Sequence, residues 1–284
     1  MAKQRANVPA KINPVETGII PFDNVPDYLK DKAQTGMEGL GKDDFKVPRI
    51  KLLQALNPEV RSFQGEAIPG EFWHTGANKS LGSTFNFVPL IVGKRVIVWD
   101  ANGGDQGGDI LAFSKNAMDW TTGGNKTFKV KLKGRKDEVT WQTGRNVATS
   151  GLLEWGSSDP EDNNSPPAAQ LTYEYLCYLP DHPMLSPCLL GLFRTGLANA
   201  RQFNTSLFML RRPTTSIIVK CFADEKSEGK LSWFVPQFKT AGFAPQELFN
   251  TCEEIQKNYA EYQAEYNHND AAQKESLPDD DGKY

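Results

Sequence analysis

A row of lysines at every second position is the part of this 284-residue sequence best suited to binding chemistry. In the segment TFKVKLK, residues 127–133, Lys129, Lys131 and Lys133 alternate with apolar residues. Because side chains alternate between the two faces of a strand, we expect the lysines on one face and the apolar residues on the other. Lysines at this spacing stand about 7 Å apart, close to the spacing of phosphates along a nucleic-acid strand. Flexible ammonium groups bind phosphates without regard to sequence.

The residues after the row strengthen this positive charge. Residues 126–145 hold seven basic and two acidic residues, a net charge of +5. Beyond the lysine row, the predicted nucleic-acid-binding residues of this segment are Arg135, Lys136, Trp141 and Arg145. Two alternatives stay open. The lysines could instead protect an exposed edge strand from aggregation, and Trp141 could be a core residue rather than a platform on which a base stacks.

Further cations lie beside aromatic residues elsewhere in the chain. KRVIVWD places Lys94 and Arg95 near Trp99, and LRRP supplies Arg211 and Arg212. Aromatic rings beside a positive groove are what single-stranded nucleic acid requires, because every base has a face to stack on and phosphates supply the remaining contacts. A reader of duplex DNA would need a basic recognition helix. The helix predicted at 197–210 carries only Arg201 before its end.

The sequence offers little for catalysis. Its histidines, His74, His182 and His268, lie in unrelated contexts, and we expect a structural role for His74. Its four cysteines form no closely spaced pair, so we expect reduced thiols and no zinc site. GMEGLGKD, residues 36–43, fits a phosphate-binding loop only formally, since no strand precedes it and Asp43 replaces the Ser or Thr. We predict no enzymatic activity, no cofactor and no metal site.

The elements that position these residues are mainly strands. Short runs rich in β-branched and aromatic residues recur from residue 46 onward, including 84–100, with Gly93 as an expected bulge or turn, and TSGLLEW at 149–155. A repeat of three and four residues predicts an amphipathic helix over 197–210, which Pro213 ends. We therefore predict a mainly β fold with helices (α+β), an elaborated OB-like barrel with one internal helix and a C-terminal amphipathic helix.

The two ends of the chain differ from this body. We predict that residues 1–45 form a flexible arm with a short helix at DYLKDKA, and that residues 46–243 form an OB-like nucleic-acid-binding body. Residues 244–267 are predicted to form a helix, and residues 268–284 a disordered tail. The helix carries an apolar stripe that begins at Leu248 and Cys252, which could pack on the body or pair with a second copy. Residues 246–284 hold ten acidic and three basic residues, a net charge of −7, whereas residues 1–245 carry +4. This asymmetry suggests two surfaces with different partners, although an acidic tail could also serve solubility alone.

No segment of the sequence resembles a signal peptide or has the length of a membrane span. We expect a cytoplasmic protein without membrane contacts.

The chain resembles phage single-stranded DNA-binding proteins. The resemblance rests on its basic β-rich body, its scattered tryptophans and its C-terminal LPDDDGKY. The runs VPRIKLLQALNPEV, FVPLIVGKRVIVWD and FRTGLANARQFNT support the resemblance. It implies an OB barrel followed by an acidic tail, and partner recognition by Asp279, Asp280, Asp281 and Tyr284. Lys283 departs from the pattern of such tails.

The leading hypothesis is sequence-independent binding of single-stranded DNA in replication or recombination, with the tail both competing for the DNA site and recruiting replication or recombination proteins. A strand-annealing protein that forms rings or filaments is the alternative in the same class. A protein-interaction or virion component that assembles through its C-terminal helix and binds no DNA is the alternative of another class. The sequence is also compatible with a homo-oligomer.

Overall fold

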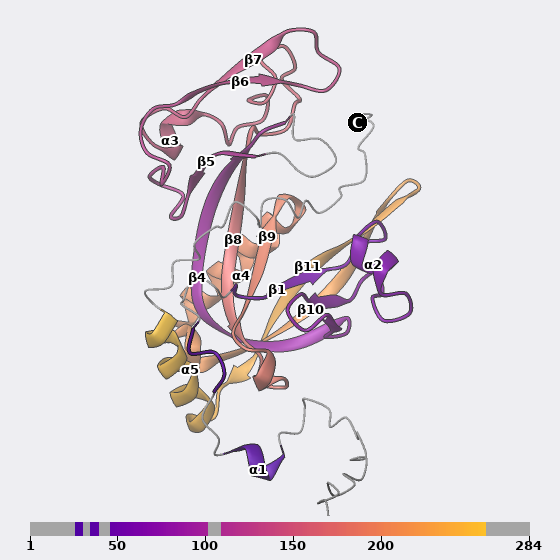
Figure 1. Cartoon of the computed structure of the whole chain (residues 1–284), viewed down its shortest axis with the longest axis vertical. Coiled ribbons are helices and arrows are strands. Elements are labelled where there is room, and N and C mark those ends of the chain that lie inside the picture. Colours follow the sequence, from indigo (N-terminus) through magenta and orange to yellow (C-terminus); the bar gives the residue numbers. More distant parts are fainter. Residues whose placement is uncertain (1–25, 31–34, 40–45, 102–108, 260–284) are drawn as a thin grey trace, which may run out of the picture. The chain divides into compact units, whose positions relative to one another are not determined.

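The computed structural model describes residues 26–30, 35–39, 46–101 and 109–259 (Figure 1). Contacts between residues divide the chain into two units, Met1–Asp44 and Phe45–Tyr284. In the described part of the first unit, helix α1 spans Asp27–Lys30, inside the segment where the sequence predicts a helix. Most of the predicted arm lies outside the described residues.

The second unit is built mainly of strands. Its strands are β1 (Arg49–Leu52), β2 (Phe72–His74), β3 (Lys79–Ser80), β4 (Thr84–Trp99), β5 (Ile110–Ser114), β6 (Thr127–Lys131), β7 (Glu138–Gln142), β8 (Ala169–Tyr178), β9 (Cys188–Phe193), β10 (Ile217–Glu228) and β11 (Leu231–Phe243). Its α-helices are α2 (Pro58–Ser62), α3 (Val147–Ser150), α4 (Leu197–Leu210) and α5 (Gln246–Tyr259). The predicted class, mainly β with helices, is confirmed, and α4 has the bounds that the sequence predicts.

Nine of the strands form one sheet, in the order β11-β10-β4-β8-β9-β1-β2-β3 with β5 paired to β4. β1 and β9 pair in parallel, whereas the long neighbours β4, β8 and β10 are antiparallel. The sheet curls into a half barrel (Figure 1).

Side chains bring the two sides of the curled sheet together. Gln54, just after β1, donates through Nε2 to the carbonyl oxygen of Phe234 on β11 at 3.0 Å and accepts from the Phe234 amide at 2.9 Å. The Gln54 side chain thus makes the pair of hydrogen bonds that a neighbouring strand would make. Nδ2 of Asn199 on α4 donates to the Pro236 carbonyl at 2.9 Å. The outer edge of β11 is therefore satisfied by side chains at these two residues.

A β-bulge in β4 decides which residues face which layer. The pairing with β8 shifts between Pro89 and Ile91, so the bulge lies at Leu90. The expected bulge at Gly93 is wrong, because Gly93 stays in the ladder opposite Glu174. The extra residue at Leu90 brings Val92 onto the face that Phe87 occupies before it.

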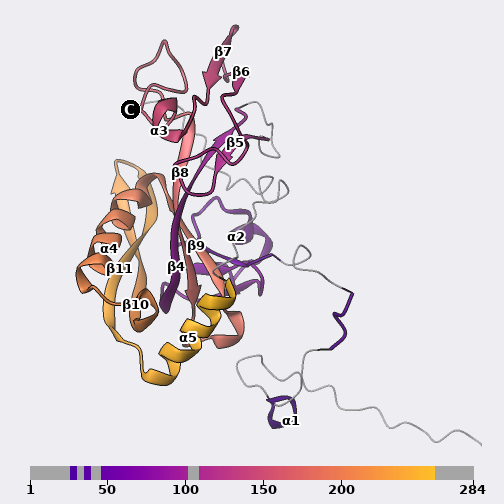
Figure 2. The same ribbon diagram turned by 90° about the vertical axis from the view of Figure 1, so that its left-hand side faces the viewer.

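The two long helices cover opposite faces of the sheet (Figure 2). Phe203 on α4 packs with Phe87 and Tyr175 in the largest core cluster. Cys252 on α5 packs against Val88, on the other face of β4. The apolar stripe of α5 thus packs on the body, one of the two predicted alternatives. The part of the predicted helix beyond Tyr259 lies outside the described residues.

Strands β6 and β7 form a separate two-stranded ribbon (Figure 1). A second core cluster supports this β6–β7 ribbon. It joins Val96 and Val98 of β4 to Val130 and Trp141 of the ribbon, with Trp120 beside them. The prediction of a strand at residues 149–155 is wrong, because helix α3 takes up the first two of these residues. The side chain of Asn146 accepts from the Thr149 amide at 2.9 Å and begins α3, and Gly151, in the left-handed region at φ 66°, ends it.

Candidate nucleic-acid interface

The lysine row lies on the exposed face of the β6–β7 ribbon. Lys129 and Lys131 are exposed, and Lys133, just past the end of β6, is exposed too. Across the ribbon, Lys129 lies opposite Thr140 and Lys131 opposite Glu138. The predicted alternation is confirmed, because Phe128 and Val130 turn to the covered face. The exposed face therefore combines three lysines with the hydroxyl of Thr140 and one carboxylate, Glu138, and keeps a net positive charge that suits a phosphate backbone.

Trp141 does not belong to this exposed face. Its side chain is 4% exposed and lies in the core cluster beneath the ribbon. Its indole Nε1 donates to the Ser158 carbonyl at 3.1 Å. The stacking role predicted for Trp141 is wrong in this conformation, because β7 turns it inward with Val139, away from Thr140. It anchors the ribbon instead.

Arg135 also has a structural role. In the turn after β6, its guanidinium forms a two-pronged contact with Asp159, through Nε at 2.8 Å and through Nη2, and its Nη1 contacts Glu161. Hydrogen bonds to these carboxylates raise the pKa of Arg135, and their negative charges offset the positive charge of the guanidinium. Arg135 thus fastens the loop at 156–168 to the ribbon. Lys136 and Arg145, the other predicted cations here, are exposed.

Trp155 is the tryptophan in this region with an exposed ring, and it was not among the predicted site residues. Its side chain is 73% exposed, in the loop that follows α3. A ring in water can stack on a base, which the buried Trp141 cannot. The polar residues around it, in LEWGSSD, are the sequence signal for an exposed loop.

The predicted binding residues on β4, which are Lys94, Arg95 and Trp99, lie on two different faces of the sheet. Lys94 is exposed and shares its face with Val92, whereas Arg95 points the other way and lies 2.9 Å from Glu174. Trp99 is half-buried and packs on Ile97, on the face of Arg95. Of these three predicted residues, Lys94 alone lies on the face that carries α4 and the ribbon.

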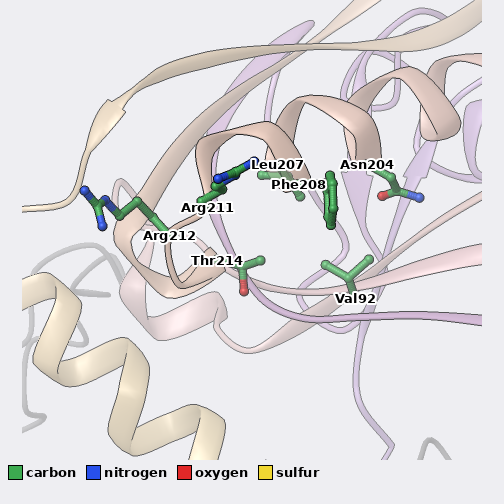
Figure 3. A pocket seen from close by; sticks show the side chains of 7 residues that line it. All are labelled: Val92, Asn204, Leu207, Phe208, Arg211, Arg212 and Thr214. Atoms are coloured by element: carbon green, nitrogen blue, oxygen red, sulfur yellow. The ribbon is translucent and has the colours of Figure 1, made fainter.

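Arg211 and Arg212 line a shallow pocket at the end of α4, with a volume of about 390 Å³ (Figure 3). The other lining residues are Val92, Asn204, Leu207, Phe208 and Thr214. In Figure 3 the Phe208 ring projects from the last turn of α4 toward Val92. Phe208 is 82% exposed. The helical period could have identified it, because residue 208 lies off the apolar stripe of Ala200, Phe203 and Leu207.

The remaining predictions concern chemistry and the chain ends. Within the described ranges, no three His, Cys, Asp or Glu side chains come together in a way that could hold a metal ion. All four cysteines are free, in agreement with the expected reduced thiols, and the structure buries all four. Burial raises the pKa of Cys177, Cys188 and Cys221. The predicted partner-binding residues Asp279, Asp280, Asp281 and Tyr284 lie outside the described residues. Among the helices described, none combines the length and the apolar character that a membrane crossing requires.

Comparison with known proteins places the chain in a phage-associated family. The sequence model of the family described as Pam3 phage gp34-like protein matches residues 16–265. No curated protein and no solved structure matches the chain. The match spans most of the sequence, and the chain belongs to this family.

Proposed function

We propose that this Pam3 phage gp34-like protein binds single-stranded DNA without sequence preference and acts in phage DNA replication or recombination. The observation that carries the proposal is the β6–β7 ribbon, with Lys129, Lys131 and Lys133 exposed and its other face fixed on the core by Val130 and Trp141. A ribbon held in this way presents its charges on a rigid support. Lys136, Arg145 and Lys94 add exposed positive charge.

Phosphate contacts of this kind give binding but no sequence preference, because the phosphate backbone is the same at every base. Lysine is suited to the task, since its ammonium adapts to a flexible strand. Exposed rings, with Trp155 as the first candidate, add stacking that a single strand can accept and a paired duplex cannot. We propose a binding role without catalysis.

For the C-terminal tail we propose a second role. Asp279, Asp280 and Asp281 supply negative charge and Tyr284 an aromatic ring, features that resemble a phosphate backbone and a base. The tail would compete weakly for the DNA site and, once displaced, recruit replication or recombination proteins.

The assembly alternative has less support. It rests on the apolar stripe of α5 being free to pair with a second copy, and Leu248, Cys252, Ile255 and Tyr259 of that stripe pack on the sheet. The annealing alternative shares the DNA-binding surface and differs in what the bound protein assembles into.

The direct test compares oligonucleotides on the full-length protein. Fluorescence anisotropy with labelled single-stranded DNA, duplex DNA and single-stranded RNA, each at low and high salt, should show preferential binding of single strands that weakens with salt. Binding that is equal for duplex and single strand, or absent at low salt, would refute the proposal. Electron microscopy of the same complexes separates coating of the strand from the rings or filaments of an annealing protein.

Removal of the tail gives a second test. A chain that lacks residues 270–284 should bind single strands more tightly than the full-length chain at low salt, and the difference should shrink as salt rises, because both competitors are held by screened charges. Equal affinities at low salt would show that the tail does not compete for the DNA site.

A further inference from the structure

The pocket at the end of α4 combines an aromatic ring, apolar walls and two cations. Phe208 is 82% exposed, yet it stands beside Val92 and Leu207 rather than alone. Arg211 and Arg212 follow the last helical turn at the mouth of the same pocket, and in Figure 3 the Arg212 guanidinium points outward from it. The pocket therefore combines a flat apolar face with the positive charge of two guanidinium groups.

We propose that this pocket receives one unstacked base of a bound single strand, which stacks on Phe208 while the adjoining phosphates lie beside Arg211 and Arg212. The proposal deepens the proposed function and rests on it. A nucleotide needs these two features together, because its base is a flat ring and its phosphate is an anion.

Polar groups in the pocket can serve the edge of such a base. Asn204 on α4 lines it, and its Oδ1 accepts from the Tyr175 hydroxyl at 2.8 Å. That hydrogen bond fixes the orientation of the amide, whose Nδ2 is the group that can donate to a base. Thr214 adds a hydroxyl on the opposite wall. One fixed amide and one rotatable hydroxyl can hydrogen-bond to any base, in keeping with sequence-independent binding.

Strand β4 runs from the pocket to the core beneath the β6–β7 ribbon. Val92 lines the pocket, Lys94 is exposed on the same face, and Val96 and Val98 continue that face beneath the ribbon core. From Val92 to Val98 the strand advances about 20 Å. A strand of DNA anchored at Phe208 would therefore pass Lys94 on its way to the ribbon.

This arrangement selects for single strands. A base inside a duplex is stacked on both faces and paired along one edge, and its extraction costs a few kcal/mol. An unpaired base enters the pocket without that cost. The lysines of the β6–β7 ribbon alone would bind any phosphate backbone, so the pocket adds to the discrimination that the exposed Trp155 ring provides.

The experiment measures the dissociation constant of a labelled poly(dT) oligonucleotide on three full-length variants. Phe208→Ala should weaken binding roughly 5- to 150-fold, the loss of one stacked base, and Phe208→Trp should retain binding. Met209→Ala is the matched control, because Met209 is the next residue, is 74% exposed and does not line the pocket. If Phe208→Ala binds as well as Met209→Ala, while the wild type binds single strands, the pocket proposal is wrong and the proposed function stands.

A second measurement locates the base directly. An oligonucleotide that carries 5-iodouracil should crosslink on irradiation to the peptide that contains Phe208, and crosslinks confined to other peptides would overturn the assignment. An acidic peptide with an aromatic end carries similar chemistry, so the peptide ESLPDDDGKY is the competitor to test. If this peptide binds in a manner that depends on Phe208, and DNA gives no crosslink at this site, the pocket binds a peptide instead.

A wild-type protein that binds no oligonucleotide at all would refute the proposed function, and the pocket proposal with it.

Discussion

At the scale of single residues, His74 illustrates a buried titratable group with a structural role. Its Nδ1 accepts from the Ala77 amide at 3.0 Å, so Nε2 carries the proton and donates to the Leu185 carbonyl at 3.1 Å. The imidazole thereby ties β2 to the segment that follows β8. Burial lowers the pKa of His74, which the hydrogen bond to Leu185 opposes in part. The structural role expected for this histidine is confirmed.

The lowered pKa predicts a pH dependence of stability. Unfolded histidine takes up a proton near pH 6.5, whereas folded His74 takes it up at a lower pH. Between the two pKa values the unfolded chain binds more protons, so the free energy of unfolding decreases as the pH falls below about 6.5. Urea titrations between pH 7.5 and pH 5 should show a smaller decrease for His74→Gln than for the wild type. Parallel profiles for the two proteins would contradict the prediction.

Single residues also mark the limit of prediction from sequence. The alternation of TFKVKLK is enough to place Lys129 and Lys131 on the outer face. It cannot decide the environment of Trp141, because a tryptophan on a two-stranded ribbon is exposed or buried according to what packs beneath it. Here the loop at 156–168 and strand β4 supply that packing. The ion pairs of Arg135 and Arg95 likewise depend on acids distant in the sequence, Asp159 and Glu174.

At the scale of elements, the bulge in β4 and helix α5 depend on each other. The bulge places the carbonyl of Leu90, a fully buried residue, outside the regular ladder with β8. Nε2 of Gln256 on α5 donates to that carbonyl at 2.6 Å. The helix thus packs its apolar stripe on the sheet and also satisfies a polar group that the bulge creates.

This dependence predicts that Gln256→Leu destabilises the fold. The substitution leaves the Leu90 carbonyl without its partner in a buried site, which costs about 1–3 kcal/mol. Chemical denaturation measures the change, and Lys257→Leu, at the exposed neighbouring position of the same helix, is the matched control. A Gln256 variant as stable as the Lys257 variant would show that the hydrogen bond contributes nothing.

The elements themselves differ in how well sequence predicts them. Helix α4 is predicted to the residue because its apolar period and Pro213 are local signals. The strand expected at 149–155 fails because the cap at Asn146 and the left-handed Gly151 outweigh its apolar residues. The prediction of a bulge at Gly93 is wrong because the position of the bulge depends on the register with β8. The residues around Gly93 do not reveal that register.

At the scale of the whole molecule, charge is distributed unevenly along the chain. Residues 1–245 carry a net charge of +4 and residues 246–284 a net charge of −7. On the folded unit, the exposed lysines of the ribbon, Lys94 on β4 and the arginines after α4 belong to elements that cover one face of the sheet. The central claim is that this face binds the phosphates of a single strand.

The salt dependence of binding tests that claim most directly. In the full-length protein, Lys129, Lys131 and Lys133 are replaced together by alanine. A control variant replaces Lys220, Lys239 and Lys257, which are also exposed but belong to other elements. For the ribbon variant we expect the slope of log K against log salt for a single strand to decrease in magnitude by about two, at about 0.7 per lost phosphate contact. The control variant should keep the wild-type slope. An unchanged slope in the ribbon variant would mean that these lysines bind no phosphates and only protect the edges of the ribbon.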